Sequence, residues 1–520
     1  MQLMTEYLGA AARTDASAPA VMHRGKIVSY GELSSRSDAL ARGLRARGVA
    51  RGDRVGLLLN KTADATVAIY AAFKLGCAYV PLNPELPAQR LIEATRMCGV
   101  RVVVTSSDIA PALRERVAAA GADLAAAGDL EDGRTSALFA PVRLSEADPA
   151  AILTTSGSTG AAKGVVITHG NLGAFVDWAV SAFRLTARDR LLSHAPLQFD
   201  LSFFDLFAAA AAGACTVLAD DADVASPARL TQLVVSTAVT VWQSVPSAIT
   251  LVAEAGARNA LAMPEVRCVL FAGERMPRRT LLALPRLFPS ARYFNIYGAT
   301  ETNDTFLYEV PGNPFDAPDP LPIGGPLPYV RYRVVDDDGN AVRDGEQGTL
   351  VVSAPTMMAG YVARDGGGER LQGRGPEYST RDLVSMASDG HLRFHGRTDA
   401  LVKTNGYRVN TLEIEDQIQS VDAVEQASVL AVPDDRTGTR LVAFVRLAPG
   451  TRLSTLDLKM KCARRLPRHA VPHQFHFVTD ALPTSPTGKV DKQRLAELLI
   501  APPDQRPTGP AARNTSHESS

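Results

Sequence analysis

Short apolar runs alternate with longer amphipathic segments along the chain, up to about residue 310. In residues 30–48, Leu33, Leu40 and Leu44 recur near helical spacing, and Gly48 ends the pattern. Similar patterns predict helices at 30–48, 62–76 and 87–99, and buried strands at 54–59 and 100–107. Because strands that alternate with helices form parallel sheets covered by helices, we expect a layered α/β core.

The pattern changes beyond that point. Asp-Gly pairs lie between short β-rich runs at residues 332–342 and 345–355, which predicts antiparallel hairpins, and residues 390–403 predict another. After Asp399 the chain predicts helices at 411–421 and 455–467 and strands at 423–435 and 440–447. We therefore expect a large domain at 1–398, a small α+β domain at 399–500, and a disordered Pro-, Ser- and Asn-rich tail at 501–520.

A donor-rich loop separates two apolar runs in the stretch ILTTSGSTGAAKGVVI, residues 152–167. Its glycines allow close backbone approach to a ligand, and successive amides can form an anion-binding nest. Hydroxyl groups and Lys163 add donors and positive charge. The spacing differs from the P-loop motif, and a strand rather than a helix is predicted after the loop. The stretch indicates a phosphate cradle, with a surface hairpin as the alternative.

Composition narrows the class of protein. The formal net charge is zero, which argues against a nucleic-acid-binding or membrane-surface protein. The five cysteines form no C-x-x-C pair, so neither a metal cluster nor a disulfide framework is suggested. The N-terminus lacks the features of a signal peptide, and the longest apolar run is too short to span a membrane. We expect a reduced, soluble, cytoplasmic protein.

Several motifs, taken with the loop, are similar to one family. In chain order they are VSYGEL (28–33), FKLGCAYVPLNP (73–84), FDLSFFDLF (199–207), NIYGATET (295–302), YSTRDLV (378–384), GRTDALVKTNGYR (396–408) and PTSPTGKVD (483–491). Their order and spacing resemble the adenylate-forming superfamily, and most closely the amino-acid adenylation domains of nonribosomal peptide synthesis. The resemblance implies an α/β fold: a large N-terminal domain of layered α/β subdomains plus a small β-barrel-like subdomain, and a small mobile α+β C-terminal domain.

The resemblance implies that the substrate carboxylate attacks the α-phosphorus of ATP, and that a phosphopantetheine thiol then displaces AMP. ATP and Mg²⁺ are the implied cofactors. The implied ATP- and AMP-binding residues are Thr155, Ser156, Ser158, Thr159, Lys163, Asn295, Tyr297, Gly298, Asp382 and Arg397. The implied catalytic residues are Lys489, Thr300 and Glu301, and Glu301 is also the implied Mg²⁺ ligand. Two positions depart from the usual pattern: Ala162 replaces a proline, and Arg381 replaces a small residue.

The family moves its small domain between the two half-reactions. Asp399 is the implied hinge, and Gly406 would line the pantetheine tunnel. Asn405 stands where relatives have a basic residue, so contacts with the carrier can differ. The chain is too short for an additional condensation or carrier domain, so we expect a monomeric, free-standing enzyme whose partners are an amino acid and a separate carrier protein bearing phosphopantetheine.

Asp200 matches the family position that binds the substrate α-amino group, and a helix N-cap is the alternative role. The implied substrate-binding residues are Asp200, Leu201, Phe204, Ser244, Leu270, Ala272, Gly273, Ile296, Asp304 and Thr305. Asp304 would read a polar group on a small substrate, such as a diamino acid, a hydroxylated amino acid or a β-amino acid, unless it points outward. Other positions resemble prolyl-activating relatives. An L-proline ligase and an acyl-CoA ligase remain the alternatives.

Overall fold

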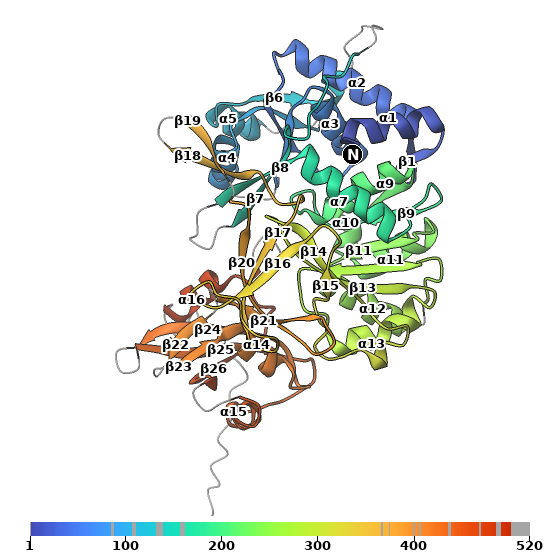
Figure 1. The fold of residues 1–520 in the computed structure, drawn as a ribbon. Helices are drawn as coiled ribbons and strands as arrows, with labels where there is room; N and C mark the ends of the chain where they lie inside the picture. The colour runs from blue at the N-terminus through green and yellow to red at the C-terminus, as the bar shows by residue number, and fades with distance from the viewer. Residues whose placement is uncertain are drawn as a thin grey trace, which may run out of the picture. The chain divides into compact units, whose positions relative to one another are not determined.

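The computed structural model describes residues 2–84, 88–106, 111–131, 139–156, 162–259, 261–365, 368–373, 375–398, 401–404, 407–434, 438–466, 470–484 and 490–500. The chain forms two compact units (Figure 1). The larger comprises residues 1–333, 351–380 and 386–393, and the smaller comprises residues 334–350, 381–385 and 394–520.

Two large mixed sheets form the framework of the larger unit. The nine-stranded sheet has the order β15 (Gly325–Pro326), β14 (Asn303–Glu309), β13 (Arg292–Ala299), β12 (Cys268–Ala272), β11 (Val241–Ser244), β9 (Arg190–Ser193), β10 (Cys215–Leu218), β1 (Pro19–His23) and β2 (Lys26–Ser29). The eight-stranded sheet has the order β19 (Gly368–Gly373), β18 (Gly360–Asp365), β8 (Ala162–Thr168), β7 (Pro149–Ser156), β4 (Ala78–Pro81), β3 (Arg54–Leu58), β5 (Val100–Thr105) and β6 (Asp123–Ala126). The strands from β13 to β1 in the first sheet, and from β7 to β6 in the second, are parallel.

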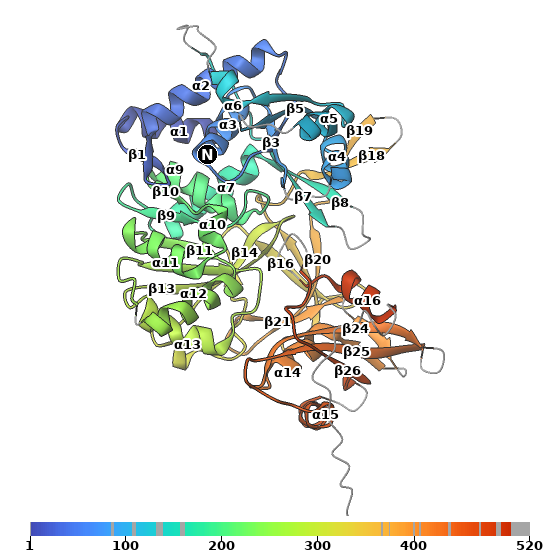
Figure 2. The ribbon, with the colours of Figure 1, turned by 180° about the vertical axis from the view of Figure 1, so that it is seen from behind.

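Helices alternate with these sheets in layers. The largest core cluster joins both sheets through α2 (Tyr30–Ala46), α3 (Ala63–Lys74) and α7 (His169–Ala182). A second cluster packs α11 (Pro227–Ser236), α12 (Pro246–Asn259) and α13 (Arg278–Leu287) on the other face of the nine-stranded sheet, as Figure 2 shows. A third packs α4 (Ala88–Met97) and α5 (Pro111–Ala119) on the eight-stranded sheet. The predicted layered α/β class is therefore confirmed.

The early predictions of elements agree closely with the structure. Helix α2 ends at Ala46, with Gly48 at φ 79°, and α3 ends at Lys74, with Gly76 at φ 72°. Glycine adopts these left-handed backbone angles without strain, which explains why both helices stop there. The sequence patterns did not predict the N-terminal helix α1 (Met4–Thr14) or the π-helix η1 (Phe204–Ala208). The remaining helices of the larger unit are α6 (Ala127–Glu131), α8 (Leu201–Phe203), α9 (Ala209–Ala212), α10 (Asp221–Val224) and the 3₁₀-helix η2 (Pro314–Asp316).

The described residues also form smaller sheets. A four-stranded sheet has the order β16 (Arg331–Val335), β17 (Gly348–Ser353), β20 (Tyr378–Met386) and β21 (Leu392–Arg397). The small unit then contains a two-stranded sheet of β22 (Leu401–Thr404) and β23 (Tyr407–Asn410), and a three-stranded sheet of β24 (Val424–Asp434), β25 (Gly438–Leu447) and β26 (Gln474–Val478). Its helices are α14 (Thr411–Gln419), α15 (Thr455–Ala463) and α16 (Lys492–Ile500).

One hairpin prediction is wrong. Residues 390–403 contain β21 and β22, but these strands belong to different sheets: β21 neighbours β20, and β22 pairs with β23. Local β-propensity cannot choose a partner strand, because pairing is decided by side-chain packing between strands.

Two further features agree with the sequence. Among the helices that the structure describes, none combines the length and apolarity needed to cross a lipid bilayer. The five cysteines are buried, and none forms a disulfide bond.

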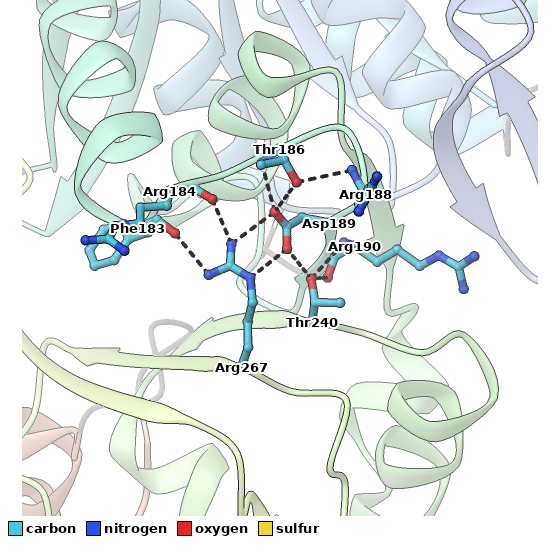
Figure 3. Close-up of polar contacts among 8 residues, drawn as sticks. All are labelled: Phe183, Arg184, Thr186, Arg188, Asp189, Arg190, Thr240 and Arg267. Atoms are coloured by element: carbon cyan, nitrogen blue, oxygen red, sulfur yellow. Dashed lines mark hydrogen bonds and ion pairs between the residues drawn. The ribbon is translucent and has the colours of Figure 1, made fainter. Parts of the chain in front are cut away.

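An ion pair between the half-buried Arg267 and the buried Asp189 ties the amino ends of the central strands together (Figure 3). Asp189 precedes β9 and accepts hydrogen bonds from Arg267 Nε at 2.8 Å and from Thr240 Oγ1 at 2.8 Å. The Arg267 guanidinium also donates to the carbonyl oxygen of Phe183 at 3.0 Å. Burial alone would raise the pKa of Asp189, but the bonds from Arg267 and Thr240 outweigh it and hold this pKa below its ordinary value. This network lies at the strand ends opposite to the candidate site.

Replacing Arg267 with alanine is expected to lower the free energy of unfolding by about 3 kcal/mol, because Asp189 would remain buried without its cationic partner. Urea unfolding followed by fluorescence measures the effect. Arg292→Ala is the matched control, since Arg292 and Glu309 form an exposed pair that contributes less than about 1 kcal/mol. Equal midpoints for the two variants would contradict this stabilising role. Because the pKa of Asp189 is lowered in the folded state, the difference from wild type should shrink as the pH falls through that pKa.

Candidate active site

The donor-rich stretch is an antiparallel strand pair joined by a loop. Strand β7 brings Thr155 directly opposite Lys163 of β8. The strand predicted after the loop is confirmed. Ser158, Thr159 and the side chain of Ser156 lie outside the described residues, so their phosphate-binding role stays a prediction.

The turn between β13 and β14 presents Glu301. Gly298 is required beside it, because a Cβ there would lie 2.2 Å from the carbonyl oxygen of Asn303. The backbone amide of Met358 donates to the Glu301 carbonyl oxygen at 2.8 Å, and Thr356 Oγ1 donates to the Thr302 carbonyl oxygen at 2.7 Å. Backbone contacts therefore fix this turn, and Thr300 and Glu301 stay half-buried within it.

One tyrosine brings the loop strand and this turn together. Tyr361 of β18 donates its hydroxyl to Glu301 Oε1 at 2.9 Å. The ammonium nitrogen of Lys163 lies 5.1 Å from the centroid of the same ring. Sequence reasoning placed Lys163 and Glu301 in one site and missed Tyr361. No sequence signal could have found it, because its partner Glu301 lies 60 residues away.

Strand β13 carries two side chains that the sequence predicted to bind the nucleotide. Asn295 Nδ2 donates to the carbonyl oxygen of Pro322 at 2.8 Å. This bond orients the amide and directs its carbonyl oxygen as the acceptor for an amino group. Tyr297 is half-buried and packs edge-to-face on Phe306, with ring centroids 5.9 Å apart.

Asp382 and Arg397 of the small unit are joined to each other. Arg397 donates to Asp382 Oδ1 at 3.0 Å, and Asp382 is 6% exposed. Arg381, where relatives have a small residue, has φ 61°. A left-handed backbone costs a residue with a Cβ roughly 1–2 kcal/mol, so glycine would suit this position better.

Three predicted residues lie outside the described part of the chain. They are the catalytic lysine Lys489, the hinge Asp399 and the tunnel residue Gly406.

The predicted pocket residues divide between two faces of the nine-stranded sheet. Leu270, Ala272 and Ile296 belong to the large core cluster, together with Phe204. Ser244 follows Trp242 of the opposite cluster by two residues, and its hydroxyl lies 2.9 Å from His194 Nδ1. Because side chains alternate along a strand, Ser244 lies on the opposite face from Leu270.

Gln243 occupies the face that Ser244 does not. It pairs in parallel register with Leu270, and it is 2% exposed. Its Oε1 atom has no hydrogen-bond partner among the described residues. The sequence analysis missed Gln243 because the short strand could not be given a register without its neighbours.

The remaining pocket positions surround the start of β14. Thr305 Oγ1 donates to the carbonyl oxygen of Tyr297 at 3.1 Å, so its hydroxyl is already used. Gly273 ends β12 with φ 86°, a left-handed angle that suits glycine. Leu201 is half-buried in α8.

Two carboxylates interact across this region. Asp200 precedes α8, but its side chain makes no capping hydrogen bond, so the N-cap alternative is not supported. Burial raises the pKa of Asp304 well above its ordinary value, and the charge of Asp200 raises it further. The carboxyl group of Asp304 therefore lies within electrostatic range of Asp200.

A buried lysine binds the carbonyl oxygens at the end of β9, upstream of Asp200. Lys61 Nζ donates to the carbonyl oxygens of Ser193 at 2.5 Å and Ala195 at 3.1 Å. Burial lowers the pKa of Lys61 to about 8. Asp205 of η1 is also buried, and the charge of Lys61 partly offsets the rise that burial causes in the pKa of Asp205. Sequence reasoning did not identify this pair, which is far apart in the chain.

The residues present fit a bound nucleotide and magnesium ion. Hydroxyl donors and Lys163 suit phosphate oxygens, and the half-buried carboxylate of Glu301 suits a hard cation that takes few protein ligands. Within the part of the chain that the structure describes, no cluster of three or more His, Cys, Asp or Glu residues could hold a metal alone.

Comparisons with known proteins agree with this geometry. The family model for the AMP-binding enzyme matches residues 8–362, and that for the AMP-binding enzyme C-terminal domain matches residues 413–489. An L-proline–[L-prolyl-carrier protein] ligase of Streptomyces coelicolor is 36% identical over 503 residues, which cover 93% of each chain. A ligase of the same name from Pseudomonas fluorescens is 34% identical over 492 residues, which cover 92% of this chain and 96% of that one.

A solved structure has the same fold. O-succinylbenzoate coenzyme A synthetase from Bacillus subtilis, in complex with ATP and magnesium ion, has a TM-score of 0.82 at 23% identity, covering 95% of this chain and 99% of that chain. The resemblance that the motifs indicated is thereby confirmed. The chain belongs to the family of AMP-binding enzymes and is an ATP-dependent, AMP-forming ligase of the amino-acid adenylation type.

Proposed function

We propose that this enzyme activates a small amino acid with a polar side chain and transfers it to a separate carrier protein. The observation that carries the proposal is a pair of half-buried carboxylates, Asp200 and Asp304, that interact electrostatically. Carboxylates partly removed from water favour cationic or hydrogen-bonding groups, and an amino acid with a second polar group brings one for each.

In the first half-reaction, a carboxylate oxygen of the amino acid attacks the α-phosphorus of ATP, and the bond to pyrophosphate breaks. Lys163 and the loop hydroxyls bind the departing phosphates, and Asn295 and Tyr297 bind adenine. Thr300 and Lys489 donate to the α-phosphate, where negative charge gathers. Glu301 would hold a Mg²⁺ ion, which would supply positive charge to neutralise the phosphates.

In the second half-reaction, a phosphopantetheine thiolate attacks the acyl carbon, and the bond to AMP breaks. Asp399 acts as the hinge that moves the small unit, and Gly406 lines the pantetheine path. The Asp382–Arg397 pair binds the ribose, because one carboxylate can accept hydrogen bonds from both ribose hydroxyls. We propose that the enzyme acts as a monomer in the cytoplasm.

The side-chain pocket consists of Gln243, Asp304 and the apolar residues Leu201, Phe204, Leu270, Ala272 and Ile296. Gln243 replaces Ser244 in this set, because its free carbonyl oxygen lies on the pocket face of the sheet. Gln243 and Asp304 together accept hydrogen bonds from an amine or hydroxyl. Diamino, hydroxylated and β-amino acids fit this chemistry.

L-Proline is the second candidate substrate. The carrier-protein ligases that are 36% and 34% identical to this chain act on L-proline by name. The apolar lining formed by Leu270 and Ala272 also suits a proline ring. An acyl-CoA ligase is disfavoured, because a plain acid offers no partner for Asp200.

The experiment is amino-acid-dependent ATP–pyrophosphate exchange across a panel of proteinogenic, diamino, hydroxylated and β-amino acids. We expect exchange with a small polar amino acid to exceed exchange with proline and with acids that lack an amine. Exchange with none of the amino acids would overturn the proposed function, and a clear preference for proline would select the second candidate.

Replacing Lys489 with alanine is expected to lower this exchange at least about 100-fold, the usual cost of losing one donor to developing charge. Thermal unfolding should be unchanged, and Lys492→Ala in the same segment is the control. Near-normal exchange by a folded Lys489→Ala enzyme would remove Lys489 from the catalytic set.

A further inference from the structure

Tyr361 contacts both charged groups that the proposed mechanism assigns to the phosphates and the metal. Its hydroxyl donates to Glu301 Oε1 at 2.9 Å, and its ring lies under Lys163, with the ammonium nitrogen 5.1 Å from the ring centroid. All three side chains are partly buried. They come from three separate segments of the chain: the strand after the loop, the β13–β14 turn and β18.

The sheet explains this arrangement. Strand β18 runs antiparallel to β8, with Tyr361 directly opposite Val165. Because side chains two residues apart on a strand share a face, Lys163 lies on the same face as Val165 and hence beside the Tyr361 ring. The contact is thus set by backbone register and does not depend on a flexible side chain finding a partner.

We propose that Tyr361 is a positioning residue that holds Glu301 and Lys163 apart and aims both at the cation-bound triphosphate; this inference rests on the proposed function. Lys163 contacts the ring and Glu301 contacts the hydroxyl of this one tyrosine, so its removal would leave no side chain between the two opposite charges to oppose a direct ion pair. In such an ion pair, the two charges would neutralise each other and would no longer be available to the phosphates and the metal. The tyrosine satisfies each group with a neutral contact that a ligand can supplement or replace.

The test separates the hydroxyl from the ring. Tyr361→Phe keeps the ring beside Lys163 and removes the hydroxyl, with its bonds to Glu301 and Tyr378, whereas Tyr361→Leu also removes the ring. ATP binding is measured by titration calorimetry, once with excess Mg²⁺ and once with EDTA. Tyr293→Phe is the matched control, because that hydroxyl donates one 2.7 Å bond to the Phe288 carbonyl oxygen, within the second core cluster on the nine-stranded sheet.

For Tyr361→Phe we expect the Kd of ATP with Mg²⁺ to rise about 10-fold, the effect of losing one hydrogen bond to a charged group. The Kd in EDTA should change less than about twofold, because the Lys163 contact remains. Tyr361→Leu should weaken binding under both conditions. In the Glu301→Gln background, Tyr361→Phe should have little further effect, since the two residues act as one unit.

Wild-type Mg²⁺-dependent binding in Tyr361→Phe, or an equal loss with and without Mg²⁺, would overturn the positioning role. Equal effects of Tyr361→Phe and Tyr293→Phe would do the same, because they would indicate a general loss of stability. If the wild-type enzyme bound no ATP under either condition, the proposed function itself would be overturned, and the inference with it.

Discussion

Replacing Asp304 with alanine is expected to invert the substrate preference of the enzyme. Burial and the charge of Asp200 raise the pKa of Asp304, so an unpartnered carboxylate at this position is costly. A substrate that donates to it gains selectivity, and a site built for a polar partner rejects an analogue that lacks one by about 10⁴-fold. In Asp304→Ala, exchange with the polar substrate should fall, and exchange with proline or alanine should rise.

Asp304→Asn is the control for shape, because it keeps the size of the side chain and loses its charge. For a substrate with a cationic side chain, the Asp304→Asn enzyme should be nearly as inactive as Asp304→Ala. For a substrate with a hydroxylated side chain, Asp304→Asn should retain much of the exchange activity. An unchanged ranking of amino acids in both variants would remove Asp304 from the specificity pocket and favour the proline ligase.

The pH dependence follows from the direction of the same shift. The raised pKa keeps Asp304 protonated further up the pH scale than an ordinary aspartate. A cationic substrate side chain needs the ionised form. Its apparent KM should therefore fall as the pH rises through this pKa, whereas the apparent KM for a neutral hydroxylated substrate should change little.

Replacing Asp200 with alanine should lower kcat/KM for every α-amino acid by about 10³-fold, because it removes the charged partner of a buried ammonium group. The loss should not depend on the side chain of the substrate. Thermal stability should be unchanged or higher, since Asp200 makes no capping bond to α8 and its removal relieves repulsion with Asp304.

Asp220→Ala is a matched control for helix capping. Asp220 accepts a hydrogen bond from the Asp223 amide at 2.9 Å and caps α10. That variant should lose about 1 kcal/mol of stability and keep its activity. If Asp200→Ala instead lost stability while exchange stayed near the wild-type rate, Asp200 would be a structural residue.

Local patterns in the sequence determined much of this fold. The helical spacing of Leu33, Leu40 and Leu44, with Gly48 beyond them, predicted α2, because an amphipathic helix and its glycine stop are encoded by neighbouring residues. Strand–helix alternation likewise predicted the layered α/β class. The motifs indicated the family and contain most of the candidate site residues, because each motif is a short contiguous stretch of sequence.

Tertiary structure alone decided which residues meet across strands and turns. The order of neighbours in a sheet placed β21 and β22 in different sheets, and register placed Gln243 rather than Ser244 beside Leu270. It also brought Tyr361 to Glu301 and Lys163, and placed Asp304 within electrostatic range of Asp200. These contacts join residues far apart in the chain, and a strand's own sequence does not state which strand pairs with it or in what register.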